Sequence, residues 1–243
     1  PNIIGSHVHT SVVIVGAGPS GLATAACLKH NGIPFILIER SGCIASLWKE
    51  RTYDSLHLHL SREYCSLPLM PIPDPQPETQ DAGHPTTHND NPNNNSNQFL
   101  SRAQFIGYLE SYAAKFELRP RFNETVRSAS FDEASHKWVI HAAVIGPFAE
   151  GPRCLRNVTY VGRWLVVATG ENSEPVLPGD ADLPGLKDFH GSYIHSSRYM
   201  NAFPYKGKRV LVIGSGNSGM EIAGELSHQA AQTSVVVRSP VRS

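Results

Sequence analysis

A chain of 243 residues with 40% hydrophobic content is long enough for one large domain or two modest ones. Its 21 basic and 21 acidic residues cancel, so its overall charge favours neither nucleic acid nor an anionic membrane surface as a partner. No apolar run approaches the roughly 18 residues of a membrane span, and four widely spaced cysteines without a Cys-x-x-Cys pair indicate reduced thiols. We therefore expect a soluble, intracellular, globular protein without a metal site.

The first forty residues predict a β-α-β unit. A β-branched strand at 11–15 meets a glycine cluster, a helix with apolar residues at helical spacing follows until Gly32, and a second strand covers 34–39. Between strand and helix, residues 16–21 satisfy G-x-G-x-x-G in the context that gives this motif its meaning. The sequence therefore predicts a parallel sheet carrying a dinucleotide site.

The glycines of this fingerprint have distinct expected roles. Gly16 permits the tight turn, Gly18 lets the backbone approach a pyrophosphate, and Gly21 lets helix and strand pack closely. Glu39 lies 18 residues past Gly21, where a carboxylate accepts hydrogen bonds from an unphosphorylated adenosine ribose. These features favour FAD at the first fingerprint.

The middle of the chain alternates weak and strong signals. We expect a disordered surface loop at 74–98, because its Asn- and Pro-rich composition offers nothing to bury. Ser101 and Gln104 then form an S-x-x-Q capping box at the start of a helix. Stretches 121–131 and 137–145 predict an antiparallel hairpin beside the parallel sheet, and 164–168 predicts a buried strand.

A second fingerprint repeats the first after a Pro- and Gly-rich link at 175–185. A strand at 208–213 leads into Gly214, Gly216 and Gly219, and another strand is expected near 233–238. The position 19 residues past Gly219 holds Arg238, beside Ser239, instead of an acid. A guanidinium there suits a 2′-phosphate and predicts NADPH, although a solvated charge at the end of a strand remains the alternative.

Residues 189–199 fit F-x-G-x-x-x-H-x-x-x-[YF], the signature of class B flavin monooxygenases, and Ala168-Thr169-Gly170 resembles their ATG motif. Stretches 43–48, 58–60, 168–175 and 214–223 are similar to the plant YUCCA flavin monooxygenases, which convert indole-3-pyruvate to the auxin indole-3-acetic acid. The resemblance implies FAD, NADPH and O2 as cofactors and co-substrate, and a place in the cytoplasm or at the endoplasmic reticulum surface. The expected cofactor-binding residues are Gly16, Gly18, Pro19, Ser20, Gly21, Glu39, Arg40, Leu47, Trp48, His59, Thr169 and Gly170 for FAD, and Gly214, Gly216, Asn217, Ser218, Gly219, Arg238 and Ser239 for NADPH.

Some residues keep two interpretations. Trp48 is either core or a neighbour of the flavin, and His59 replaces an asparagine that drug-metabolising relatives place near the flavin, so that asparagine's role does not transfer. For His195, a structural or domain-coupling role is favoured over proton transfer. The other histidines, including His84, His88 and His141, show no metal spacing. No catalytic side chain is assigned.

The expected fold is α/β, with two Rossmann-like dinucleotide-binding units. Residues 1–205, which end in an inter-domain linker at about 175–205, are predicted to form the FAD-binding domain, and 206–243 the start of a truncated NADPH-binding domain. Residues 1–243 alone are therefore not expected to complete the reaction. Two other functions remain open. One is a non-catalytic FAD-binding fragment, and the other is a disulfide-reductase-like flavoprotein, against which the missing Cys-x-x-Cys counts.

Overall fold

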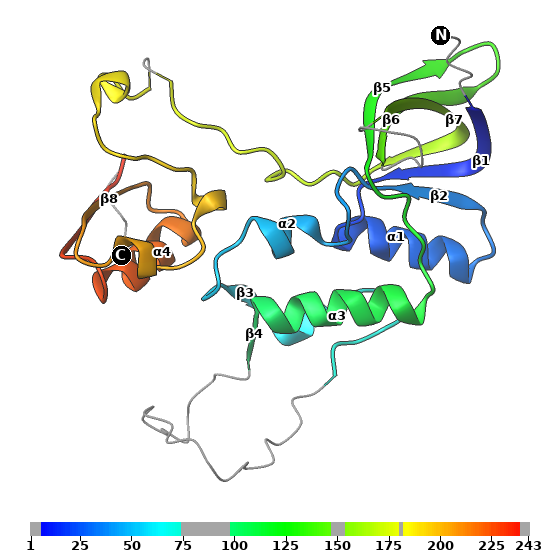
Figure 1. Cartoon of the computed structure of the whole chain (residues 1–243). Coiled ribbons are helices and arrows are strands. Elements are labelled where there is room, and N and C mark those ends of the chain that lie inside the picture. Colours follow the sequence, from blue (N-terminus) through cyan, green and yellow to red (C-terminus); the bar gives the residue numbers. More distant parts are fainter. Residues whose placement is uncertain (1–5, 74–97, 147–153, 180–181, 239–243) are drawn as a thin grey trace. The chain divides into compact units, whose positions relative to one another are not determined.

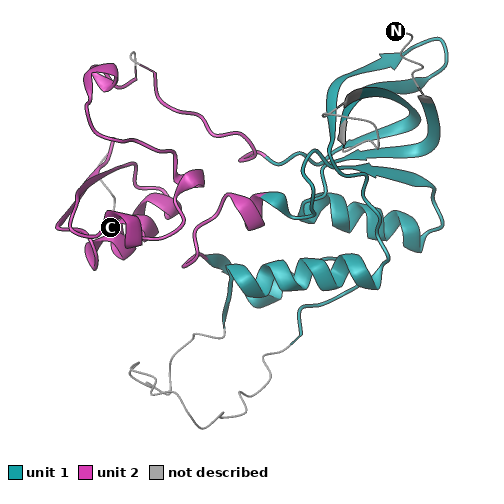
Figure 2. Cartoon of the chain, in the orientation of Figure 1, with its two compact units in different colours: residues 1–46, 57–170 teal, residues 47–56, 171–243 magenta. Residues whose placement is uncertain are grey.

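The computed structural model describes residues 6–73, 98–146, 154–179 and 182–238 (Figure 1). The chain forms two compact units, shown in separate colours in Figure 2: unit 1 contains 1–46 and 57–170, and unit 2 contains 47–56 and 171–243. The predicted loop at 74–98 lies outside the described residues except for Gln98. The expected assignment of one cofactor to each side of residue 205 remains a prediction.

Unit 1 is built on a five-stranded mixed sheet in the order β2-β1-β7-β6-β5. Its strands are β1 (Ser6–Val15), β2 (Phe35–Ile38), β5 (Glu124–Asp132), β6 (Lys137–Gly146) and β7 (Cys154–Val167). The strands β2, β1 and β7 run parallel, whereas β7, β6 and β5 run antiparallel. The expected parallel sheet and antiparallel hairpin are both present, and β7 joins them into one sheet.

Helices cover the parallel end of this sheet. The helix α1 (Pro19–His30) packs on β1 and β2, and α3 (Arg102–Lys115) lies along α1 on the side away from the sheet (Figure 1). Leu22, Ala25 and Ala26 of α1 are completely buried, and the small size of the two alanines lets the helix approach the strands closely. The α1 position is therefore fixed by packing.

The remaining elements of unit 1 are the strand pair β3 (His57–Ser61) and β4 (Phe99–Ser101) and a 3₁₀ turn, η1 (Arg62–Cys65). The predicted capping box starts α3: the Gln104 N–H donates to Ser101 Oγ at 3.2 Å, and the Ser101 N–H donates to Gln104 Oε1 at 2.9 Å. This prediction is confirmed.

The prediction of a buried strand at 164–168 is wrong in its burial and its length. Trp164 is 58% exposed and Val167 is 70% exposed, and the strand β7 begins ten residues earlier, at Cys154. The buried part of β7 precedes this stretch, where Val158 and Tyr160 enter the core with Val13 of β1. The apolar run therefore marks the carboxyl end of β7, where the described residues leave Trp164 and Val167 exposed.

Unit 2 repeats the strand-turn-helix-strand opening of the chain with β8 (Arg209–Ile213), α4 (Asn217–Ser227) and β9 (Gln232–Val236). The strands β8 and β9 are parallel, as predicted. The other elements are most of α2 (Ser46–Glu50) and three 3₁₀ turns, η3 (Leu186–Asp188), η4 (Ser196–Arg198) and η5 (Phe203–Tyr205). The core of unit 2 consists of Tyr53, Tyr199, Ala202, Ile222 and Leu226. In the part of the chain that the structure describes, no helix has the length and apolar character needed to cross a membrane.

Candidate dinucleotide-binding sites

Two glycines of the first fingerprint are required by the packing of the protein itself. Gly16 has φ +108°, a conformation that side chains rarely adopt, and its N–H donates to Ile38 O at 2.8 Å. A Cβ on Gly16 would overlap the carbonyl of Ala168, and a Cβ on Gly21 would overlap the carbonyl of Gly16. These positions fix the turn against β7 and against α1.

Gly18 differs from Gly16 and Gly21, because no contact with the described residues requires it to be glycine. Its φ of −79° is open to any residue, and a Cβ built there meets no atom within 4 Å. Gly18 is the N-cap of α1 and supplies no side-chain hydrogen bond to the first turn of the helix. This open space beside uncapped N–H groups fits the close approach of a pyrophosphate, as the motif predicts.

Glu39 is held rigidly at the carboxyl end of β2. Its side chain is 6% exposed, and its two oxygens accept the N–H groups of Ala17 at 2.7 Å and Ser41 at 2.9 Å. Its own backbone is bonded on both sides, to Arg121 O at 2.9 Å and from Glu124 N at 3.0 Å. Oε1 also accepts the Ser46 hydroxyl at 3.5 Å, whereas Oε2 still has acceptor capacity, so the expected contacts with ribose hydroxyls remain a prediction.

A buried polar network that the sequence did not reveal supports the backbone of Glu39. Tyr160 is completely buried and donates its phenol to the Glu124 carboxylate, and Arg121 Nη1 donates to Tyr160 Oη at 3.1 Å. Burial and the Glu124 contact raise the pKa of Tyr160 to about 12. Because Arg121 and Glu124 also bond the Glu39 backbone, the network fixes the residue that is expected to meet the ribose.

The other predicted FAD residues fall into two groups. Pro19 and Ser20 begin α1, and the exposed Arg40, Thr169 and Gly170 follow the carboxyl ends of β2 and β7, next to the fingerprint turn. Leu47 and Trp48 are half-buried in unit 2, whereas His59 is exposed on β3 of unit 1. For these last three residues a shared flavin site remains a prediction.

The second fingerprint repeats most of the geometry of the first, although a Cβ on Gly214, unlike one on Gly16, would meet no described atom within 4 Å. Gly214 has φ +113°, its N–H donates to Val236 O at 2.8 Å, and a Cβ on Gly219 would overlap its carbonyl. Gly216 is again an N-cap with no atom within 4 Å of a built Cβ, and Asn217 and Ser218 open α4. The structure therefore contains two copies of one phosphate-binding type of turn.

The matching hydrogen bonds align the ends of the two sites. Gly16 bonds Ile38 and Gly214 bonds Val236, so the position equivalent to Glu39 is occupied by Val237, and Arg238 is equivalent to Arg40. From the sequence, Arg238 is predicted at the position equivalent to Glu39, whereas the hydrogen bonds place it one residue later. Ser239 lies outside the described residues. The second site thus lacks the carboxylate that would repel a 2′-phosphate.

The signature at 189–199 ends in the core of unit 2. The His195 ring accepts the Ser197 N–H at 3.1 Å and caps η4, while Tyr199 is 3% exposed. This capping is a structural role of the kind that the sequence favoured, and proton transfer by His195 is not tested. His84 and His88 lie outside the described residues, and His141 is exposed on β6, 3.1 Å from Thr159 Oγ1.

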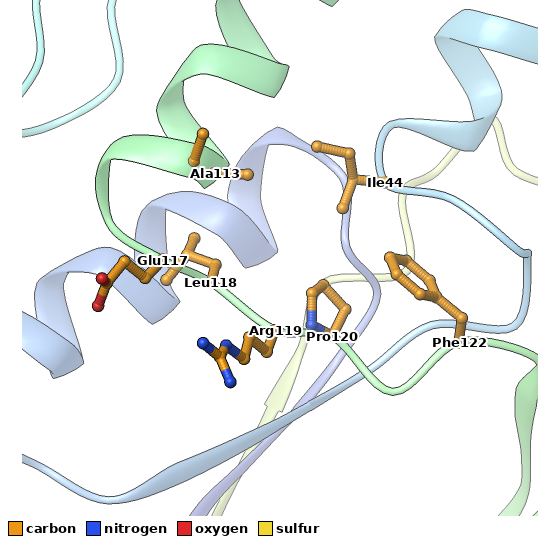
Figure 3. A pocket seen from close by; sticks show the side chains of 8 residues that line it. Ile44, Ala113, Glu117, Leu118, Arg119, Pro120 and Phe122 are labelled. Atoms are coloured by element: carbon orange, nitrogen blue, oxygen red, sulfur yellow. The ribbon is translucent and has the colours of Figure 1, made fainter.

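A separate hollow of about 540 Å³ lies at the carboxyl end of α3 (Figure 3). Its apolar lining includes Ile44, Leu118 and Phe122, and its charged residues are Glu117 and Arg119. Glu117 is paired with Lys29 at 3.1 Å. None of the fingerprint residues lines this hollow.

The chain matches the family described as flavin-binding monooxygenase-like over residues 9–241. The chain belongs to this family. It is 49% identical over 230 residues to the probable indole-3-pyruvate monooxygenase YUCCA9 of Arabidopsis thaliana, covering 94% of this chain and 47% of that protein. It is 47% identical over 236 residues to the indole-3-pyruvate monooxygenase YUCCA6 of the same plant, covering 96% and 49%. The chain spans about half the length of the curated relatives it matches.

Solved structures agree with the fold. A flavin-containing monooxygenase from Stenotrophomonas maltophilia aligns with a TM-score of 0.72 and 25% identity, covering 96% of this chain and 58% of that one. An oxidised steroid monooxygenase bound to NADP aligns with a TM-score of 0.66 and 27% identity, covering 94% and 38%. The expected α/β fold and, at the level of the family, the expected cofactors FAD and NADPH are confirmed, whereas the residues that hold them remain predictions.

Proposed function

We propose that this chain carries FAD and NADPH for a monooxygenase that converts indole-3-pyruvate, O2, NADPH and a proton to indole-3-acetate, carbon dioxide, water and NADP⁺. The observation that carries the cofactor part is the pair of equivalent turns, which differ at the ribose edge: Glu39 in the first and Val237 in the second. The substrate follows from the relatives, which are named as indole-3-pyruvate monooxygenases.

In this proposal, FAD occupies the first turn. The pyrophosphate lies over Gly18 and the first turn of α1, and the adenosine ribose donates to Glu39. The bound flavin supplies the redox and oxygen chemistry, so the protein's task is to bind, orient and exclude water. The rigid setting of Glu39, with five hydrogen bonds from or to its neighbours, suits that task because it leaves little reorganisation for binding.

NADPH occupies the second turn. Its pyrophosphate lies over Gly216, and its 2′-phosphate meets the exposed Arg238 guanidinium. The charge-neutral Val237 in place of an acid removes the repulsion that would otherwise select NADH. We further propose that the protein works in the cytoplasm, with indole-3-pyruvate and O2 as its small-molecule partners.

A chimaera tests the whole proposal. Residues 1–243 replace the matched segment of YUCCA9, and the purified protein is supplied with indole-3-pyruvate, NADPH and ¹⁸O2. We expect indole-3-acetate with one labelled carboxyl oxygen, detected by mass spectrometry, in a 1:1 ratio to NADPH consumed. Intact YUCCA9 is the positive control.

The outcomes separate the alternatives. A folded chimaera that binds FAD and NADPH but leaves indole-3-pyruvate unchanged would refute the substrate. Loss of FAD binding, both in the chimaera and in residues 1–243 alone, would refute the first site. NADPH-dependent reduction of a disulfide without labelled product would favour the reductase alternative, and flavin binding without any reduction by NADPH would favour the non-catalytic one.

A further inference from the structure

The segment 47–56 belongs to unit 2 although its neighbours in sequence belong to unit 1. It is tied to the rest of unit 2 at several points: the Asp54 N–H donates to Met200 O at 2.8 Å, Arg51 donates to Ser173 O, and Ser55 Oγ donates to Glu225 Oε2 at 2.8 Å. The segment is thus a built part of the unit that carries the second fingerprint.

Tyr53 is the residue of this segment that reaches the fingerprint. Tyr53 is 3% exposed, its phenol donates to Glu221 Oε2 at 2.5 Å, and the Ser218 side chain lies close enough to lower the pKa of that phenol. Ser218 is the second residue of α4 and belongs to the G-x-G-x-x-G turn, and Glu221 lies one turn later. One phenol therefore connects the glycine turn with the next turn of the helix.

The direction of these bonds follows from the chemistry of the groups. Burial and the Glu221 carboxylate raise the pKa of Tyr53 to about 12, so its phenol remains a proton donor at neutral pH. Because the phenol proton is given to Glu221, the phenol oxygen is left as an acceptor, which a hydroxyl such as that of Ser218 can meet as a donor. The Glu221 charge is satisfied by the Tyr53 donor at its side.

The ring of Tyr53 is itself fixed by the signature segment. Tyr199, the last residue of the signature, packs edge-on against it with ring centroids 6.2 Å apart and an interplanar angle of 63°. Glu225, four residues after Glu221 on α4, accepts the Ala202 N–H at 3.0 Å just beyond Tyr199. Signature, segment 47–56 and helix α4 therefore share one core.

We propose that Tyr53 is a positioning residue for the dinucleotide phosphate of NADPH at the second fingerprint. It acts through Glu221, with Ser218 beside it, by holding the first two turns of α4 in the orientation that the N–H groups at the start of the helix need. The inference rests on the proposed NADPH site. It predicts an effect on any dinucleotide with a pyrophosphate, whether or not a 2′-phosphate is present.

The test is calorimetric titration of residues 1–243 with NADP⁺ and with NAD⁺, for the wild type, Tyr53→Phe and Ser55→Ala. We expect Tyr53→Phe to weaken both nucleotides by about tenfold, the worth of one hydrogen bond near a charged group, with an unchanged ratio between them. Ser55→Ala removes a bond from the same segment to the same helix one turn further on. It should lower the unfolding midpoint without changing either affinity.

Each other result has a meaning. A wild type that does not bind NADP⁺ overturns the proposed NADPH site and this inference with it. A wild type that binds, with Tyr53→Phe within twofold of it, overturns the positioning role alone. Equal weakening by Ser55→Ala also overturns it, because the effect would then be a general loosening of α4.

Discussion

The two kinds of glycine in the first fingerprint can be separated by a pair of substitutions, Gly18→Val and Gly21→Ala. Gly18 has φ −79° and ψ −175°, which a β-branched residue before Pro19 adopts without strain, and a Cβ there meets nothing within 4 Å. The cost of Gly18→Val to folding is therefore limited to a poorer N-cap, below about 1 kcal/mol.

Gly21→Ala behaves in the opposite way. The added methyl would overlap the backbone carbonyl of Gly16, which cannot rotate aside as a side chain can. The helix would have to move, yet Leu22, Ala25 and Ala26 hold it against the sheet with no exposed surface. Overpacking of this kind costs about 1–3 kcal/mol, and we expect the upper end because both sides of the clash are backbone.

Two measurements on each variant check this reasoning. Urea unfolding of the FAD-free protein, followed by circular dichroism, gives the free energy of unfolding, and FAD titration followed by flavin fluorescence gives the affinity. We expect Gly18→Val to keep the wild-type stability and lose FAD binding, because its side chain fills the pyrophosphate's space. If Gly18→Val binds FAD as the wild type does, or is destabilised as much as Gly21→Ala, the assignment of Gly18 to the cofactor is wrong.

Three further outcomes follow. Arg238→Ala should remove most of the preference for NADPH over NADH, which is about 1.5–3 kcal/mol or ten- to a hundredfold in the ratio of dissociation constants. Val237→Glu should shift this ratio in the same direction, because the added carboxylate repels the 2′-phosphate. Unchanged selectivity in both variants would contradict the assignment of NADPH to the second site. Ser101→Ala should lower the free energy of unfolding by about 1 kcal/mol and leave FAD affinity unchanged, as measured by the same two assays. Because the pKa values of Tyr53 and Tyr160 are raised from 10.0 to about 12, the two phenols contribute fully to stability below pH 10, and this contribution is lost as the pH rises toward 12. The urea concentration at the midpoint of unfolding should therefore fall between pH 10 and 12, and a constant midpoint over this range would contradict the reasoning.

Sequence patterns predicted those elements that are defined by residues a few positions apart in the chain. The α3 capping box and the glycine turns have side-chain and backbone requirements within a few residues, so one sequence suffices to place them. The hairpin of β5 and β6 was found for the same reason, since its turn residue Asp132 accepts the Ala134 N–H at 3.2 Å.

Long-range burial escaped this approach. In the first part of β7, buried and more exposed residues alternate: Val158, Tyr160 and Gly162 are buried, whereas Asn157 and Thr159 between them are more exposed. This period of two was available in the sequence, but the strongly apolar run at 164–168 outweighed it. The network of Arg121, Glu124 and Tyr160 had no local signal, because it joins the segment 121–124 to β7, and only the sheet brings these two segments together. The same holds for Tyr53 and α4, which are separated by more than 160 residues.

Counting residues from a glycine also has a limit that the second site makes clear. Glu39 is 18 residues past Gly21 and Arg238 is 19 past Gly219, a difference of one that motif spacing tolerates. The hydrogen bonds decide the alignment: the first glycine of each turn donates to the last residue of β2 or of β9, so that Glu39 is equivalent to Val237. Discrimination at the second site therefore has two separable parts, the acid that Val237 replaces and the cation that follows it. Because a neutral residue alone only stops rejecting the 2′-phosphate, we propose that positive selection for NADPH comes from Arg238.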